Sequence, residues 1–276
     1  MAVKTWTNGA GTGNWGTAAN WSPAAIPVHN VDSVEIPATT SGNISLGLDQ
    51  SAVNLLGCHV HKGFKGNIGA ASDPLRISAD LFVYEGDGDL YLQAESDTGL
   101  AIDRLIINTD NTAHEIPLTI SGSAFTLIEI VKGSASYGGV TALVELDISY
   151  RDIPSTDAYF RLHSGAAVSG LLVKNAGILE IETSSTVSTF RQSGGLTIVN
   201  GVSPFTTYHQ TGGVVQFTGV VGAGDILGTA LLQGGMLDYS QIASTVALGI
   251  VVEYPGFEIL ANGRGTYTSR RIVGAE

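Results

Sequence analysis

The chain has 276 residues, of which 43% are hydrophobic and only 14% charged, and this balance excludes a disordered protein because there is ample apolar material for a core. Its formal net charge is −12, so an acidic surface makes direct binding to nucleic acid phosphates unfavourable. Glycine is the outlier at 36 residues without a three-residue period, which excludes collagen, and a single cysteine excludes an intrachain disulfide.

Residues 1–37 differ from the rest of the chain because they hold all three tryptophans, Trp6, Trp15 and Trp21. A stack of strands has an open end that exposes its core and its strand edges, and an aromatic segment folded across that end would close it. We therefore predict an N-terminal cap or attachment segment. The alternative is an aromatic cluster that stacks on carbohydrate. The first residues lack the apolar centre of a signal peptide, and no apolar run approaches the roughly 18 residues of a membrane span, so we expect cytoplasmic synthesis and no membrane partner.

The run Cys58-His59-Val60-His61 has the residue types of a metal site. In a strand, His59 and His61 share one face and Cys58 points to the other. A structural zinc site needs about four ligands, usually from two clusters, whereas the remaining histidines are scattered along the chain. We interpret the pair as surface histidines beside a buried cysteine, and predict no metal and no cofactor.

Carboxylates alternate with glycine at 85–89, a pattern of hard oxygens that suits calcium. The spacing of a calcium-binding hand is absent, so we favour an acidic turn between strands. Glu145 with Asp147, and Glu180 with Glu182, place two acids on one strand face, and a polysaccharide hydrolase uses such a pair of carboxylates for catalysis. Outward acids also follow from simple alternation with inward apolar residues, and we predict no catalytic residues.

Short stretches with period two recur along the chain, and no long stretch has helical periodicity. Examples are 143–148, 178–182 and 196–199, which are rich in large apolar or β-branched residues. The chain is therefore predicted to be all-β, with many short strands.

A repeat occupies the second half of the chain. Residues 190–198, 208–217 and 231–239 share an aromatic residue or leucine, a glutamine, a glycine pair and an alternating strand. Gly195 and Gly213 are 18 positions apart, and a longer step of 22 to the next copy indicates an inserted loop. A near-fixed step of this kind favours stacked turns over an antiparallel sandwich.

The repeat predicts a parallel β-solenoid, or β-helix, with turns of about 18 residues. Stacking places Leu196, Val214 and Met236 in one column, and we predict a buried core that contains Leu196, Ile198, Val214 and Leu237. The predicted organisation is a cap at 1–37, a solenoid body at 38–260 and a basic tail at 261–276. Arg264, Arg270 and Arg271 give that tail its charge and are candidate docking residues on an acidic partner.

One motif supports a resemblance to known proteins. Its residues are Trp6, Gly9, Gly11, Trp15, Asn20, Trp21, Pro27, Asp32, Val34 and Ile36. This opening resembles that of β-helical passenger and adhesin-like proteins and of phage virion proteins with similar solenoids. The glutamine and glycine repeats resemble the same broad group, and the likeness covers roughly 6–36 and 174–240.

The resemblance implies a function. Adhesins of this kind normally carry a signal peptide and a membrane barrel. We expect neither in this chain, and this favours a phage component. We expect a non-enzymatic structural protein of a tailed bacteriophage virion, most simply a capsid decoration or cement protein. It would form a homotrimer bound to the major capsid protein or another virion protein, without direct contact with nucleic acid. The alternatives are a short tail fibre or spike that binds a host surface glycan, and a polysaccharide depolymerase.

Overall fold

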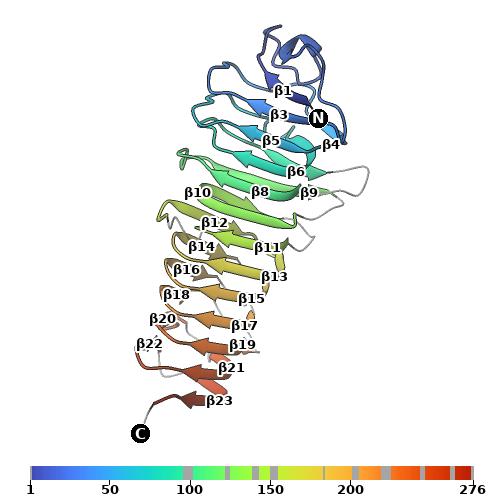
Figure 1. Cartoon of the computed structure of the whole chain (residues 1–276). Helices are drawn as coiled ribbons and strands as arrows, with labels where there is room; N and C mark the ends of the chain where they lie inside the picture. The colour runs from blue at the N-terminus through green and yellow to red at the C-terminus, as the bar shows by residue number, and fades with distance from the viewer. Residues whose placement is uncertain are drawn as a thin grey trace. The chain divides into compact units, whose positions relative to one another are not determined.

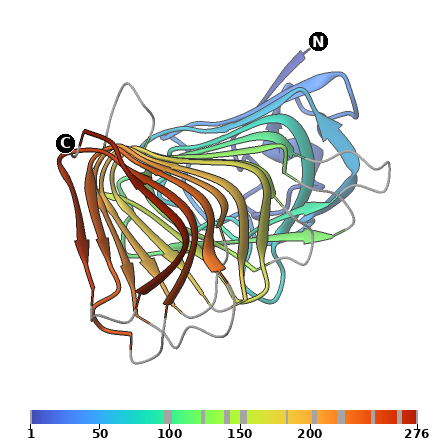
Figure 2. The ribbon, with the colours of Figure 1, turned by 90° about the horizontal axis from the view of Figure 1, so that it is seen from below.

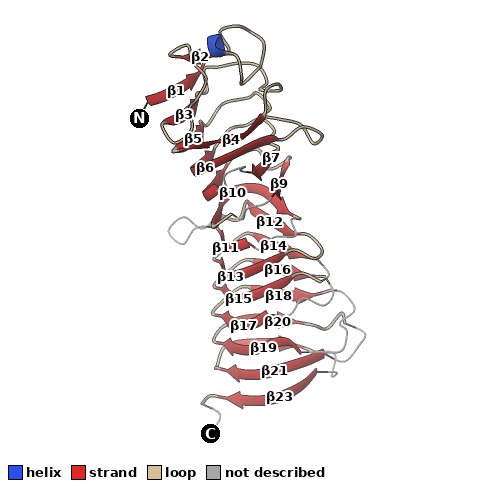
Figure 3. Ribbon diagram, turned by 90° about the vertical axis from the view of Figure 1, so that its right-hand side faces the viewer, coloured by secondary structure: helices blue, strands red, loops and turns tan. Residues whose placement is uncertain are grey.

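The computed structural model describes residues 2–95, 102–121, 125–138, 143–149, 155–182, 184–200, 205–218, 225–242, 246–261 and 265–274. The described chain is 60% strand and contains no α-helix. Its one helical element is a short 3-10 turn, η1 (Ala18–Asn20), drawn in blue in Figure 3. No helix in the described part is long and apolar enough to cross a membrane. The predicted all-β parallel solenoid is confirmed.

Contacts divide the chain into two compact units, Met1–Thr141 and Ala142–Glu276, called unit 1 and unit 2 below. The strands of unit 1 are β1 (Ala2–Trp6), β2 (Trp21–Ser22), β3 (Asp32–Ile36), β4 (Asp49–Leu55), β5 (Gly57–Val60), β6 (Leu75–Tyr84), β7 (Leu92–Glu95), β8 (Ile102–Asn108), β9 (Glu115–Ser121) and β10 (Leu127–Tyr137). The strands of unit 2 are β11 (Leu143–Ile148), β12 (Ala158–Leu162), β13 (Ala167–Lys174), β14 (Ile178–Ile181), β15 (Thr186–Gln192), β16 (Leu196–Val199), β17 (Phe205–Gln210), β18 (Val214–Phe217), β19 (Asp225–Leu232), β20 (Gly235–Asp238), β21 (Val246–Glu253), β22 (Phe257–Leu260) and β23 (Gly265–Ile272). The predicted boundaries at residues 37 and 260 stay predictions.

Unit 1 is built on two parallel ladders. The first runs β1–β3–β5–β6–β8–β10, and the second runs β4–β6–β7–β9–β10. The strands β6 and β10 are long enough to belong to both ladders, and each bends from one face of the solenoid to the next. The short β2 pairs antiparallel with β1.

Unit 2 is more regular, because alternate strands form two parallel ladders. One runs β11–β13–β15–β17–β19–β21–β23, and the other runs β12–β14–β16–β18–β20–β22. In Figure 1 the strands of the first ladder lie one above another, and Figure 2 shows them from the end of the stack. Neighbouring turns therefore hydrogen-bond to each other through the strands on two faces, as expected of a solenoid.

The predicted turn length of about 18 residues holds for only part of the chain. Pairing of Ile178 with Leu196, and of Leu196 with Val214, gives two steps of 18 residues, whereas the turns average about 22. The difference lies in the corners. The step from Val199 to Phe205 spans six positions, and the equivalent step from Phe217 to Leu227 spans ten. Longer connections between strands therefore lengthen a turn beyond 18 residues.

The core register differs from the predicted one by one residue. Leu196, Val214 and Met236 do form one column, but all three are partly exposed on the outer face, as is Ile198. The inner positions are the next ones along, and only Leu237 of the four predicted core residues is buried. The physical reason is column consistency: Ile198 is in register with Glu180 and Gln216, and Gln216 with Asp238, so this column contains two carboxylates and faces solvent. The buried columns of this face contain Phe160, Leu179, Thr197, Val215 and Leu237, and Leu162, Ile181, Val199 and Phe217.

The core of unit 1 follows the same rule. One column contains Val34, Cys58, Phe82, Leu105 and Ile128, and the adjacent one contains Ile36, Val60, Tyr84, Ile107 and Ile130. Every one of these side chains is at most 2% exposed. The intervening positions point outward, and they carry the polar groups described below.

Candidate functional site

The three tryptophans of residues 1–37 form one buried cluster. Trp21 lies between Trp6 and Trp15, with ring centroids 5.0 and 4.8 Å apart and edge-to-face geometry on both sides. Its indole N–H donates to the Trp15 carbonyl at 2.7 Å, and the buried Asn20 ties the surrounding loop together through Ala10, Thr12 and Asn14.

The cluster cannot act as a platform for sugar rings, because all three indoles are at most 2% exposed. Its position is instead consistent with closure of the first turn, since Thr5 pairs with Glu35 and Trp6 therefore falls beside the Ile36 column. The role of Trp6, Trp15 and Trp21 as a cap stays a prediction.

A column of buried polar side chains, not predicted from the sequence, lies at one corner of unit 2. Lys174, Gln192 and Gln210 are in register on consecutive turns and are at most 1% exposed. The Gln192 amide donates to Gly195 O at 3.3 Å and Val214 O at 3.0 Å, and its oxygen accepts from Thr197. The repeated glutamine is thus a hydrogen-bonded link between turns.

The glycine pairs accommodate this column. Gly195 and Gly213 have φ of +70° and +75°, which L side chains rarely adopt. A Cβ at Gly195 would also lie 2.4 Å from Lys174 Nζ, and one at Gly213 would lie 2.6 Å from Gln192 Nε2. The spacing of glutamine and glycine in the repeat therefore reflects one contact between consecutive turns, in which the buried side chain of one turn packs against a glycine of the next.

Lys174 stands where the next two turns have glutamine. Its ammonium donates to Gly194 O at 2.8 Å, and burial lowers its pKa from 10.5 to about 7. Such a group could act as a base where a substrate reached it. Its side chain is fully enclosed, however, so we assign it to the internal column.

The acidic pair Glu180 and Glu182 lies on the outer face of β14, as alternation predicts. Glu180 accepts from Tyr159 Oη at 2.6 Å, from Asn200 at 3.0 Å and from Arg161 at 3.3 Å. The Tyr159 hydrogen bond, helped by Arg161 and Asn200, outweighs burial and lowers the pKa of Glu180. Glu182 is 3.3 Å from His163 Nδ1 and accepts from Ser164 N. Both carboxylates therefore accept hydrogen bonds from neighbouring side chains or backbone and lie beside basic residues.

The second acidic pair, Glu145 and Asp147, lies on β11. Glu145 is exposed and Asp147 is half-buried, and they pair in register with the apolar residues Leu171 and Val173 of β13. No second carboxylate faces them from that neighbouring strand.

The acidic run at 85–89 forms a tight corner after β6. A Cβ on Gly88 would lie 2.1 Å from Gly66 O in the turn before, so the corners of neighbouring turns are in close contact. Asp89 accepts from Asn111 at 3.5 Å and lies 3.6 Å from His114, whereas Glu85 faces His59. The carboxylates of Glu85 and Asp89 therefore contact different residues.

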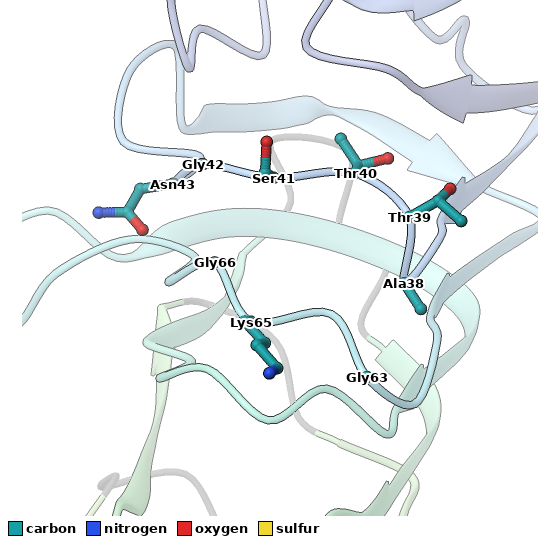
Figure 4. Close-up of a pocket in the computed structure, with 9 residues that line it drawn as sticks. All are labelled: Ala38, Thr39, Thr40, Ser41, Gly42, Asn43, Gly63, Lys65 and Gly66. Carbon is teal, nitrogen blue, oxygen red and sulfur yellow. The ribbon is translucent and has the colours of Figure 1, made fainter.

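A shallow hollow of about 280 Å³ lies between the corner that follows β3 and the corner that follows β5. Figure 4 shows its lining, Ala38, Thr39, Thr40, Ser41, Gly42, Asn43, Gly63, Lys65 and Gly66. Thr40 donates to Trp6 O at 2.9 Å, so part of the lining serves the fold. Lys65 is the one ionisable residue of the lining, and a hollow of hydroxyls and one amine offers no paired acid and base.

The last described turn of unit 2, β22 with β23, carries the predicted docking residues. Arg270 makes a bidentate ion pair with Glu253, at 2.9 and 2.8 Å, and lies over the Tyr267 ring. Arg271 is exposed, and Arg264 lies outside the described residues. Arg270 is therefore paired within the chain. Of the three predicted docking residues, Arg271 is the described one that is directed to solvent.

The histidine pair on β5 has the predicted facing. Cys58 is 2% exposed in the core, and burial raises the pKa of its thiol well above the usual range. His59 and His61 stack on the outer face with ring centroids 4.0 Å apart. Sequence reasoning missed their partner Glu35, because it lies 24 residues before His59 and is brought alongside only by the pairing of β3 with β5.

Comparison with protein-family models, with curated proteins and with solved structures finds no match for this chain.

Proposed function

We propose that this protein is a non-enzymatic structural component of a tailed bacteriophage virion, a capsid decoration protein that assembles as a homotrimer and binds the head lattice. The virion assignment rests on the resemblance of the tryptophan-rich opening and of the glycine repeats. The observation that supports an assembly role is the last turn of unit 2, where described residues of β22 and β23 are all at least partly exposed.

That turn presents a strand edge and apolar side chains together. Within the described residues β23 pairs only with β21, and Ile272 is 51% exposed beside Arg271. Unpaired strand edges are templates for association and are normally covered or blunted. A partner surface that covers Ile272 and pairs with Arg271 would satisfy both features.

A second copy of the chain is the occupant that we propose, because the same turn is then covered in every copy. Pairing of Arg271 with a carboxylate on the flank of the next copy would offset part of the repulsion between chains of net charge −12. Such a head-to-flank contact is heterologous, and it closes into a ring when the rotation between copies is one third of a turn.

The absence of enzymatic activity is part of the proposal, and the acidic pair of β14 supports it. A glycosidase general acid has a raised pKa so that it is protonated at neutral pH. The pKa of Glu180 is lowered instead, by Tyr159 first and then by Arg161. Release of reducing sugar from a host capsule, abolished by Glu180→Gln with Glu182→Gln, would contradict this part.

Sedimentation equilibrium tests the assembly. We expect three times the 28.6 kDa chain mass for the wild type. Arg271→Glu combined with Ile272→Asp should dissociate the trimer while preserving the strand signal in circular dichroism. The control Lys65→Glu reverses a charge outside this turn and should leave the trimer intact. A monomeric wild type at micromolar concentration would contradict the trimer.

Electron microscopy of the parent particle tests the location. Copies on the head lattice would support the decoration role. Copies at the tail would point instead to a fibre or spike, and a virion without this chain would refute the assignment to the particle.

A further inference from the structure

We infer that unit 1 carries a binding site for a divalent transition metal of the Zn²⁺ type, with Glu35, His59 and His61 as its protein ligands. One ligand atom from each of these residues lies within 4.8 Å of the other two. It is the one such group of three among the residues that the structure describes. The inference is independent of the proposed virion role.

The strand pairing creates the group. His59 and His61 are two residues apart on and just after β5, so both point outward, with rings at 27°. Glu35 of β3 is in register with His59. Its Oε2 is hydrogen-bonded to His61 Nε2 and lies 3.6 Å from His59 Nδ1. Backbone pairing therefore holds all three ligands on adjacent turns.

A second carboxylate orients His59. Glu85, in the turn after β5, lies 2.9 Å from His59 Nε2 and also accepts from Asn108 at 2.9 Å. This contact fixes the orientation of the His59 ring, with Nε2 toward Glu85 and Nδ1 toward Glu35. Carboxylate, histidine and metal are arranged in this order in many zinc proteins.

The group suits a cation. Glu35 Oε2 lies 3.6 Å from His59 Nδ1 and is hydrogen-bonded to His61 Nε2, so one carboxylate oxygen faces two ring nitrogens. A cation placed among these three atoms is attracted by the carboxylate and accepts a lone pair from each neutral imidazole. A metal ion supplies the charge to both nitrogens and to Glu35 together.

The donor set selects the class of metal. Two imidazoles and one carboxylate suit zinc and its neighbours, whereas calcium and magnesium prefer oxygen alone. Cys58 is not a ligand because it points into the core. The ligand side chains are 32–41% exposed, so the ion reaches the site from solvent and keeps a fourth position for water.

The consequence of binding is a cross-link between two consecutive turns. Glu35 belongs to the turn of β3 and both histidines to the turn of β5. An ion held by both turns binds the folded state in preference to the unfolded chain, so zinc should raise the midpoint of thermal unfolding in proportion to the logarithm of its free concentration.

Titration of the tag-free full chain with zinc chloride tests the site. We expect one Zn²⁺ per chain by calorimetry, and visible d–d bands of four- or five-coordinate Co²⁺ in the cobalt-loaded protein. Glu35→Gln and His61→Gln should each lower the zinc association constant at least tenfold. The control His209→Gln removes a partly exposed histidine that contacts Gln233 in unit 2, and it should bind zinc like the wild type.

Glu85 acts through His59, and Glu85→Gln separates this positioning role from ligation. The variant should keep one ion per chain but lose affinity by about tenfold, the lower end of second-shell effects, with altered cobalt bands. Circular dichroism must show that each variant retains the strand signal. Equal zinc affinity in the wild type and in Glu35→Gln with His61→Gln combined would overturn the inference, as would a wild type that binds no zinc at micromolar concentration.

Discussion

Gln192 and Gln210 are neighbours in register on consecutive turns, and each donates its side-chain amide to a backbone carbonyl near the start of a strand in the following turn. The acceptors are Val214 O at 3.0 Å and Met236 O at 3.1 Å. Each amide also reaches a glycine carbonyl of its own turn, at 3.3 and 3.0 Å. Gly195 O and Gly213 O also accept from Val214 N and Met236 N, both at 2.9 Å, so the side chains add a second set of hydrogen bonds between turns.

Removal of one amide should be costly. Gln210→Ala takes the donor from Gly213 O and Met236 O and the acceptor from Tyr208 Oη, which is 2.6 Å away. A buried polar group without a partner costs about 1–3 kcal/mol, so we expect a loss of at least that size in the free energy of unfolding. Chemical denaturation measures it. Gln241→Ala, at an exposed glutamine of the same unit, should change stability by less than about 0.5 kcal/mol.

The glycine of the pair should be intolerant of a methyl group for two separable reasons. Gly213→Ala adds backbone strain at φ +75° and a Cβ that meets Gln192 Nε2 at 2.6 Å. Gly165→Ala adds strain at φ +81° with no atom within 4 Å of the new Cβ. Thermal unfolding of both variants isolates the contact: we expect about 1 kcal/mol for Gly165→Ala and clearly more for Gly213→Ala. Equal losses would show that the column tolerates the methyl group.

Lys174 gives the folded state a defined dependence on pH. Burial lowers its pKa from 10.5 to about 7. Between these values the unfolded chain binds a proton that the folded chain does not, so stability rises with pH across this window, by up to about 1.4 kcal/mol per unit. Below pH 7 both states are protonated and the cost of burying the charge is fully present.

The variant Lys174→Gln extends the glutamine column and removes this titration. It should be more stable than the wild type at pH 7, and its advantage should shrink as the pH rises to 9.5. Denaturant unfolding at several pH values measures the difference, in which titrations common to both proteins cancel. A constant difference across the window would mean that Lys174 stays protonated in the fold.

The indole N–H groups of the tryptophan cluster differ in a way that can be measured. Trp21 Nε1 donates to Trp15 O at 2.7 Å, whereas Trp6 Nε1 is buried without a hydrogen-bond partner in the described structure. Both rings are replaced conservatively by phenylalanine. Trp21→Phe should destabilise by about 1–3 kcal/mol more than Trp6→Phe, because it strands a buried carbonyl. The reverse order in thermal unfolding would contradict this hydrogen-bond pattern.

The fold class was predictable because strand alternation and the glycine repeat are local signals. The longer corner from Phe217 to Leu227 was also predictable, from the 22-residue step between glycine pairs, whereas the average turn of about 22 residues was not, because the repeat covers only part of the chain. The burial of Lys174 was equally hidden, because its meaning depends on Gln192 one turn later. The Glu35 and histidine group required the register of β3 with β5. Contacts between turns decide these features, and no single stretch of sequence contains them.

The register of the outer and inner faces provides the last prediction, with one substitution made on each face. Leu196 is partly exposed on β16, whereas Leu237 on β20 is 0% exposed. Leu237→Ala leaves a cavity and should cost about 2–5 kcal/mol, whereas Leu196→Ala removes mainly surface contacts and should cost less than about 1 kcal/mol. Denaturant unfolding of the two variants under one condition compares identical chemistry in the same unit. A loss of several kcal/mol for Leu196→Ala would place that residue in the core, and every strand of this ladder would then have its faces exchanged.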